Sequence, residues 1–426
     1  MLVTSDNVRP LLKVSNSDIA TFKRCRRKWN LGSFNRRNLI ARKPSTALWI
    51  GTGGHYALEH WKHYGGEHGI IDAFEQWVDK EYYRFQDILG GTVTEQVWKE
   101  LQVAVNIGRE VLVHYSKYAQ KNDPFRMVAR EYEFSVPIPN VRISLHDSTG
   151  RLAQWVVNTW GEKYWENEDF KKTYVDRGLH WHADDALDDR TYSIPALFVG
   201  RLDGIVQMVE DPSIYFVIDH KFLRRTLSEE TLLIDEQTSK YIWAARVAHS
   251  NGWWNVIDNA AKIRGVYYNI IIKKPPKIPE LLKSGKTSTA KITTTKDVFL
   301  KTLKERKQDP ADYKEALAKL ENAEEKFFVR HRILRSQHEI DLVGDRLYYE
   351  YADMQRVHEL NPDIRNPAIY PSPTKDCAWE CQFRQACYAA NYGGDAEYLL
   401  REAMQVSDRT YYIDSEMFEA MEYFDE

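Results

Sequence analysis

Three separated segments of the chain carry residues that could together bind a divalent metal ion. His55 lies in a predicted helix, Asp203 lies in a Gly-Arg-Leu-Asp-Gly segment, and the third segment reads Asp219-His220-Lys221. If the strands predicted around Asp203 and Asp219 are adjacent, their carboxylates and the backbone carbonyl of His220 form an oxygen-rich site that suits Mg²⁺ or Mn²⁺. The imidazole of His55 would add a nitrogen ligand and shift the preference toward Mn²⁺.

Two further side chains are expected at the same site. Lys221 is predicted to share a strand face with Asp219, because strand side chains alternate with a period of two. Its ammonium could orient an attacking water and offset charge on a phosphate. Glu59 follows His55 by one helical turn and is expected to be a further ligand or to hold His55 by a hydrogen bond. Each feature alone is weak, since Asp-x-Lys triplets are common and lone histidines are usually structural, so the hypothesis rests on their joint occurrence.

The secondary structure expected around these residues is mixed. Apolar residues at spacings of three and four predict helices over residues 15–31, 49–64, 71–89, 95–119, 228–249 and 312–332. Alternating or continuous apolar runs rich in Val, Ile, Phe and Tyr predict strands over residues 130–138, 196–209, 213–220 and 265–272. Residues 275–295, rich in Lys, Thr, Ser and Pro, are predicted to be a loop. This order of elements predicts an α/β core with a mixed central sheet flanked by helices.

Composition limits the class of protein. The chain has 426 residues, of which 43% are hydrophobic and 28% are charged, as in ordinary globular proteins. Apolar runs are too short for a membrane span and no secretory signal is visible, so a cytoplasmic location is expected. The net charge of −3 does not favour nucleic acid, but basic residues interleaved with aromatic ones over residues 22–43 suit phosphate and base contacts.

We expect five consecutive segments. They are a helical N-terminal part (1–130), a core with a polar insertion at 139–193 (131–275), a Lys/Thr-rich loop with a charged helix (276–345), a cysteine-rich segment (346–400) and an acidic tail (401–426).

Taken together, these motifs resemble the RecB-type branch of the PD-(D/E)XK nuclease superfamily, and especially its iron–sulfur members, which include CRISPR-associated and phage exonucleases. The resemblance implies a restriction-endonuclease-like core in which His55, Asp203, Asp219 and Lys221 are catalytic. It also assigns the family's Gln-x-x-x-Tyr motif to Gln237 and Tyr241, which would share one helix face and contact DNA or support the site.

The four cysteines fit the same branch. Cys377, Cys381 and Cys387 lie near the C-terminus and Cys25 lies near the N-terminus. This one-plus-three spacing resembles the family's four-iron, four-sulfur cluster, which takes four thiolates. A structural Zn²⁺ site with four cysteine ligands is the alternative.

The expected function is that of a Mg²⁺- or Mn²⁺-dependent deoxyribonuclease, an exonuclease that processes DNA ends or single strands for recombination or repair. A phage origin would place it in the host cytoplasm, with a recombination or single-strand-annealing protein as a candidate partner. The alternatives are a nuclease that trims DNA for CRISPR spacer acquisition and a non-catalytic DNA-end-binding scaffold. Ser284-Gly285-Lys286-Thr287 superficially matches a phosphate-binding loop, but Glu280 stands where the first glycine is required. We therefore expect no ATP site, and a loop that contacts DNA or a partner.

Overall fold

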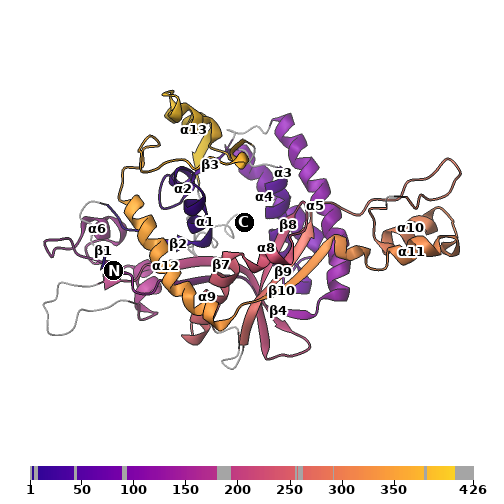
Figure 1. Cartoon of the computed structure of the whole chain (residues 1–426), viewed down its shortest axis with the longest axis horizontal. Helices are drawn as coiled ribbons and strands as arrows, with labels where there is room; N and C mark the ends of the chain where they lie inside the picture. Colours follow the sequence, from indigo (N-terminus) through magenta and orange to yellow (C-terminus); the bar gives the residue numbers. More distant parts are fainter. Residues whose placement is uncertain are drawn as a thin grey trace, which may run out of the picture.

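The computed structural model describes residues 2–3, 8–42, 46–88, 94–179, 193–254, 257, 262–290, 292–378 and 381–407. A mixed sheet lies at its centre and helices cover both faces (Figure 1). The predicted α/β class is thereby confirmed. Within the described ranges, every helix is too short or too polar to cross a bilayer.

The central sheet contains six strands. They are β2 (Lys13–Ser15), β4 (Phe125–Pro137), β7 (Leu197–Met208), β8 (Ile214–Leu223), β9 (Lys262–Ile272) and β10 (Phe328–Leu334). Strand β8 is parallel to β9 and antiparallel to β7, and β10 closes the far edge against β9. Strands β7 and β8 read as nearly continuous apolar runs because both of their faces are buried. The strands expected at 196–209 and 213–220 are therefore neighbours, as the sequence predicted.

Strand β7 has three partners, and this leaves a gap in the sheet. Strand β4 pairs along residues 197–208 and so occupies one edge of β7. The other edge is shared, because β2 pairs with residues 197–199 and β8 pairs with residues 204–207. Asp203 lies in the unpaired stretch between them, and the β7–β8 register continues from Gly204↔Ile218 to Asp203 opposite Asp219.

Three long helices cover one face of the sheet. They are α3 (Thr46–His60), α4 (Ile70–Ile88) and α5 (Glu95–Asn122), and a short turn at Lys62–Tyr64 follows α3. Their apolar sides pack with the sheet residues Phe216, Ile218 and Phe222 in one buried core. The predicted helices at 49–64, 71–89 and 95–119 correspond to these elements, although Leu89 lies outside the described residues.

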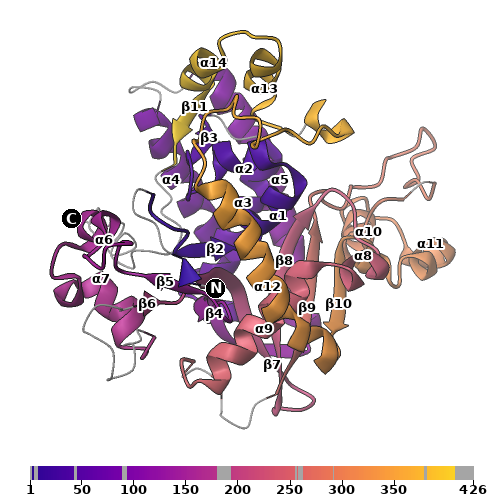
Figure 2. The same ribbon diagram turned by 60° about the vertical axis from the view of Figure 1, so that its left-hand side comes forward.

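The opposite face is covered by α9 (Glu236–Ser250) and α12 (Gln337–His358), with α1 (Asn16–Arg24) beside them (Figure 2). Leu197, Val217 and Ile270 of the sheet pack with Leu347 of α12 in a second buried core. Helix α12 begins with a capping box in which Ser336 and Glu339 satisfy each other's backbone N–H groups.

Two predicted helices are each divided in the structure. The helix expected over 15–31 is broken at Cys25, whose extended backbone (φ −164°, ψ 109°) ends α1 and starts α2 (Arg26–Gly32). The helix expected over 228–249 is divided into α8 (Glu229–Leu233) and α9, because Asp235 caps the second helix through the N–H of Gln237.

The helix predicted over 312–332 is wrong in its second half. Helix α11 (Lys314–Lys319) is short, and β10 follows it as the edge strand beside β9. Phe328 and Ile333 of this strand are buried, whereas Arg332 is exposed. Charged side chains are common on edge strands, where they discourage pairing with other chains. In this segment their spacing resembled that of the polar face of a helix, and for that reason the sequence predicted a helix.

The insertion at 139–193 is polar in composition, but it contributes large apolar side chains to a buried core. Its residues 180–192 lie outside the described part, and the rest forms β5 (Arg142–Ser144), α6 (Gln154–Trp160), α7 (Glu168–Phe170), a π-helical turn (Lys171–Val175) and β6 (Ser193–Ile194). Strand β5 also pairs with β1 (Leu2–Val3). Trp155, Phe170 and Tyr174 are buried and join the second core.

The C-terminal part returns to the N-terminal part. Helices α13 (Arg384–Asn391) and α14 (Ala396–Ala403) lead into β11 (Met404–Val406), which pairs with β3 (Leu39–Ala41). Leu31, Phe383 and Leu400 pack between them. Residues 408–426 of the predicted acidic tail lie outside the described residues, and the predicted segment boundaries stay predictions.

Candidate active site

Two carboxylates meet where β7 and β8 separate. The backbone N–H of His220 donates a 2.6 Å hydrogen bond to Oδ2 of Asp203, which ties the two strands together beyond their last backbone pair. Lys221 lies on the same face as Asp219, as the strand period predicted, and its Nζ is 2.8 Å from Oδ2 and 3.0 Å from Oδ1 of that residue. The structure therefore brings Asp203, Asp219 and Lys221 to one place.

His55 reaches this place because α3 lies directly on β8. Gly54 has no side chain, and a Cβ there would lie 2.2 Å from the ring of Phe222 on β8. The close approach brings Nδ1 of His55 to 3.3 Å from Oδ1 of Asp203. Gly54 thus determines how close His55 lies to the sheet.

Glu131 on β4 is a further member of the site that the sequence analysis missed. Strand β4 pairs with β7 so that Arg130 and Tyr132 face Gly204 and Leu202, which places Glu131 beside Asp203. One ligand atom from each of Glu131, His55 and Asp203 lies within 4.8 Å of the others. Glu131 also has a positive φ of 40°, an unfavourable backbone conformation for a side-chain-bearing residue that is common at functional sites. An acidic residue in the predicted strand 130–138 was the available signal, but only the pairing register identifies which one.

Arg201 holds two acidic residues in place. Its Nε is 2.6 Å from Oε2 of Glu131, and its Nη2 is 3.0 Å from Oε1 of Glu59. Glu59 contacts Arg201, and its predicted role as a metal ligand or as a partner of His55 stays a prediction. Arg201, two residues before Asp203, positions the carboxylate of Glu131.

The electrostatics of the site favour a cation. Burial would lower the pKa of His55, but the carboxylates of Asp203, Glu131 and Asp219 outweigh it and raise that pKa to about 9. Burial raises the pKa of Asp203, yet the positive charge of His55 more than offsets this and holds it below its usual range. Burial and the charge of Asp203 raise the pKa of Glu131. Three crowded carboxylates thus attract positive charge to their centre.

The side chain of His220 turns to the opposite face of β8. Its Nδ1 is 2.8 Å from Nδ2 of Asn269, which donates a second hydrogen bond of 2.7 Å to the hydroxyl of Tyr115. Burial lowers the pKa of His220 to about 4, so the ring is neutral. The N–H and C=O of one strand residue point to the same side, so the backbone carbonyl of His220 faces the Asp203 side together with its N–H.

Gln237 and Tyr241 on α9 line a cleft next to these residues. The cleft has a volume of about 430 Å³ and is also lined by Arg201 and by the first turns of α1. Oε1 of Gln237 is 3.5 Å from Nζ of Lys221, at the limit of a hydrogen bond. Both residues of the Gln-x-x-x-Tyr motif therefore face the site side of α9.

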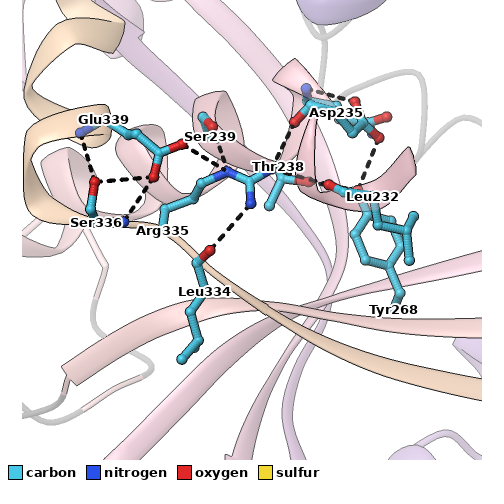
Figure 3. Close-up of polar contacts among 10 residues, drawn as sticks. Leu232, Asp235, Thr238, Ser239, Tyr268, Leu334, Arg335, Ser336 and Glu339 are labelled. Atoms are coloured by element: carbon cyan, nitrogen blue, oxygen red, sulfur yellow. Dashed lines mark hydrogen bonds and ion pairs between the residues drawn. The ribbon is translucent and has the colours of Figure 1, made fainter. Parts of the chain in front are cut away.

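A buried arginine fixes the turn that carries Gln237 (Figure 3). Arg335 donates hydrogen bonds to the hydroxyl of Ser239 and to the carbonyls of Leu232 and Asp235. Asp235 in turn accepts a 3.0 Å hydrogen bond from the hydroxyl of Tyr268, whose ring lies 6.0 Å from Nζ of Lys221. The start of α9 is thus tied both to α12 and to the strand beside Lys221.

The four cysteines have free thiols and lie at the junction of the N- and C-terminal parts. Sγ of Cys25 accepts hydrogen bonds from the backbone N–H groups of Lys28 and Ser372, and the guanidinium of Arg27 donates to Sγ of Cys387. Cys377 and Cys25 are close enough to Cys381 to contribute, after burial, to its raised pKa. Residues 350 positions apart in sequence are therefore neighbours here.

Comparison with known proteins agrees with this geometry. A family model described as PD-(D/E)XK nuclease superfamily matches residues 13–388, which include the whole sheet, the site and the four cysteines. No curated protein matches the chain significantly. The chain belongs to the PD-(D/E)XK nuclease superfamily.

Proposed function

We propose that the protein is a Mg²⁺- or Mn²⁺-dependent deoxyribonuclease of the iron–sulfur exonuclease branch that removes nucleotides from DNA ends or single strands. The observation that carries this proposal is the group formed by His55, Glu131 and Asp203, with ligand atoms within 4.8 Å of one another, beside the Asp219–Lys221 pair. A superfamily member with these groups together has the means to hydrolyse a phosphodiester.

The donor atoms of this group fit a hard divalent cation. Asp203, Glu131 and Asp219 offer carboxylate oxygens, His55 offers a nitrogen, and the carbonyl of His220 lies on the same side. A bound ion would supply Lewis acidity and neutralise charge that develops on the scissile phosphate. The carboxylates that raise the pKa of His55 would also attract a cation, and that cation would have to displace the proton of the ring before its nitrogen could bind.

Lys221 would act on the attacking water. Its ammonium is held by Asp219 and lies near Gln237, so its direction is determined by two partners. From there it can orient a water by a hydrogen bond and balance negative charge on the phosphate. Burial and the charge of Asp203 raise the pKa of Asp219, while the charge of Lys221 lowers it. The protonation of Asp219 therefore depends on the position of Lys221.

The Ser284-Gly285-Lys286-Thr287 segment forms a hairpin. Gly285 and Thr287 are held in a hairpin by Gln308 and Tyr313, and no helix starts at this segment. This hairpin differs from a phosphate-binding loop, which leads directly into a helix. We place the protein in DNA recombination or repair in the cytoplasm, in the host if it comes from a phage.

We further propose that Cys25, Cys377, Cys381 and Cys387 bind a 4Fe–4S cluster. Sγ of Cys25 and of Cys377 accepts hydrogen bonds from backbone N–H groups, and Sγ of Cys387 accepts one from the guanidinium of Arg27, as is common for sulfurs that bind a cluster. The cluster would fasten α2 to the C-terminal segment, away from the catalytic carboxylates. Measurement of iron, sulfide and zinc in anaerobically purified protein distinguishes it from a Zn²⁺ site.

The test of the nuclease uses end-labelled linear DNA, single- and double-stranded, with closed circular DNA as the control for endonuclease activity. We expect Mn²⁺-dependent release of short products from linear DNA only. Glu131→Gln should abolish cleavage, whereas Glu133→Gln, two positions along β4 and exposed, should retain it. Cleavage of circular DNA would contradict the exonuclease assignment. End binding without any cleavage would indicate a scaffold.

A further inference from the structure

A basic hairpin projects from the end of β9, next to the end of β8 that carries Lys221. We call residues 273–293 the basic arm. Strand β9 ends at Ile272, which pairs with Leu223 on β8, two residues beyond the level of Lys221. The arm begins at the next residue, and Figures 1 and 2 show it extending from the body together with α10 (Lys296–Glu305) and α11. Its base therefore lies close to the active site and its tip lies far from it.

The arm has a defined shape. The N–H of Lys277 donates to the carbonyl of Thr293, and the N–H of Leu282 donates to the carbonyl of Lys286. Arg306, which follows the last residue of α10, donates to the carbonyls of Pro279 and Glu280 on one side of the hairpin and to the hydroxyl of Thr287 on the other. The α10–α11 unit has its own buried cluster of Phe299, Leu303, Tyr313 and Leu320. The α10–α11 unit therefore holds the two sides of the hairpin in place.

The arm is strongly positive, unlike the unit that supports it. Residues 273–293 contain six lysines and one acidic residue, whereas residues 296–326 contain eight basic and eight acidic residues. Lys274, Lys277, Lys283 and Lys286 are exposed, and among the described residues none of them forms an ion pair. The positive charge continues at the base, where Arg224 and Arg225 follow β8 and are exposed.

Like charges also crowd at the base of the arm. Nζ of Lys273 would lie 3.8 Å from a Cβ placed on Gly51 of α3, one turn before His55. Burial and the charge of Arg224 lower the pKa of Lys273. A group of neighbouring positive charges is stabilised by an anion. Several positive side chains along the arm therefore suit the repeated phosphates of a DNA backbone.

The chemistry of the arm favours duplex over single-stranded DNA. Single-strand-binding surfaces combine positive charge with aromatic rings on which bases stack. Residues 273–298 contain no Phe, Tyr, Trp or His; beside the lysines they carry Ser, Thr, Pro and the exposed aliphatic residues Ile278, Leu281 and Leu282. Lysine and hydroxyl side chains contact phosphates, and aliphatic side chains are used in the minor groove.

We propose that the basic arm binds the phosphate backbone of the duplex next to the DNA end that is being processed. This inference rests on the proposed nuclease function and adds its substrate class, an end attached to a duplex. From Lys273 to Leu282 an extended chain spans about 30 Å. That length is about one helical turn of DNA, so the arm can contact the duplex about one turn away from the catalytic residues.

The test measures binding without metal, so that it does not depend on cleavage. Fluorescence anisotropy in EDTA would compare a labelled 20-base-pair duplex with a single strand of the same length, as a function of salt. The variant replaces Lys274, Lys277, Lys283 and Lys286 by Ala. The matched control replaces the exposed Lys301, Lys304, Lys314 and Lys319 of the supporting unit by Ala.

We expect the arm variant to weaken duplex binding at least 10-fold and to lower the slope of log K against log salt by about one per lost phosphate contact. Single-strand binding and cleavage of short single-stranded DNA should stay within about 2-fold of wild type. Unchanged duplex affinity would overturn the proposal and leave the arm to a protein partner. An equal loss in both lysine variants would also overturn it, because the arm would then have no special role. Absence of cleavage by the wild type and by both lysine variants would reject the nuclease function. The binding result would still be interpretable, because it is measured without metal.

Discussion

Replacement of Gly54 by alanine tests whether the contact between α3 and β8 positions the metal site. The new Cβ would lie 2.2 to 2.6 Å from three ring atoms of Phe222, so either the ring or the helix must move. Overpacking of this kind costs about 1 to 3 kcal/mol, and the better helix propensity of alanine returns up to about 1 kcal/mol. His55 is the next residue, and a displacement of about 1 Å at a reacting centre can reduce the rate about 100-fold.

Gly51 provides the matched control on the same helix. A Cβ at Gly51 meets only Nζ of Lys273, at 3.8 Å, which is an ordinary contact. Gly51→Ala should therefore gain the helix propensity without the clash and should be as stable as wild type or up to about 1 kcal/mol more stable. Cleavage of single-stranded DNA by this variant should remain near the wild-type rate.

The assay combines denaturant unfolding with Mn²⁺-dependent cleavage of a labelled single strand. Gly54→Ala should lose at least 10-fold in cleavage while it remains folded, and Gly54→Ala combined with Phe222→Leu should recover part of that loss, because the smaller side chain makes room. Wild-type cleavage by Gly54→Ala would contradict this prediction, since the site would then not need the close approach of α3 to β8.

The remaining predictions concern the carboxylates and the cysteines. Asp219→Ala and Lys221→Ala should each abolish cleavage while a gel-shift assay shows retained DNA binding; Mn²⁺-dependent activity in both would remove the pair from the site. Cys25→Ser should lose bound metal and melt at a lower temperature, and full metal content in this variant would show that Cys25 is not a ligand. Burial raises the pKa of Asp18 from 3.8 to about 6, so the folded state holds its proton more tightly and this stabilising term disappears as pH rises from about 4 through 6. Relative to Asp18→Asn, the wild type should lose about 3 kcal/mol of unfolding free energy over that range; parallel pH profiles would contradict this.

The parts of the site that could be predicted were those that local patterns determine. Asp203 and Asp219 each lie in an apolar run interrupted by a short turn, which makes an antiparallel pair the simplest arrangement. Lys221 follows from the strand period, and His55 lies in a helix that the spacing of apolar residues predicts. Glu131 could not be identified in this way, because its place beside Asp203 depends on how β4 aligns with β7, more than 60 residues away in sequence.

Tertiary pairing also explains the errors in the fold. Residues 328–334 form a strand because β9 offers them an unpaired edge, and nothing in their own charge pattern indicates that edge. The break at Cys25 also depends on tertiary contacts. Apolar residues recur with helical spacing on both sides of it, so the local pattern predicts one continuous helix. The extended backbone of Cys25 brings Sγ to the N–H of Ser372, a partner that a local pattern does not contain.

The contact between the two ends of the described chain has a consequence for biosynthesis. Strand β3 at residues 39–41 pairs with residues 404–406, and Arg27 contacts Cys387. During translation, α2 and β3 leave the ribosome long before these partners exist, and such distant pairs are also slow to form. A nascent chain that lacks residues 377–406 therefore cannot close this junction, so assembly around Cys25 waits until these residues have been synthesised.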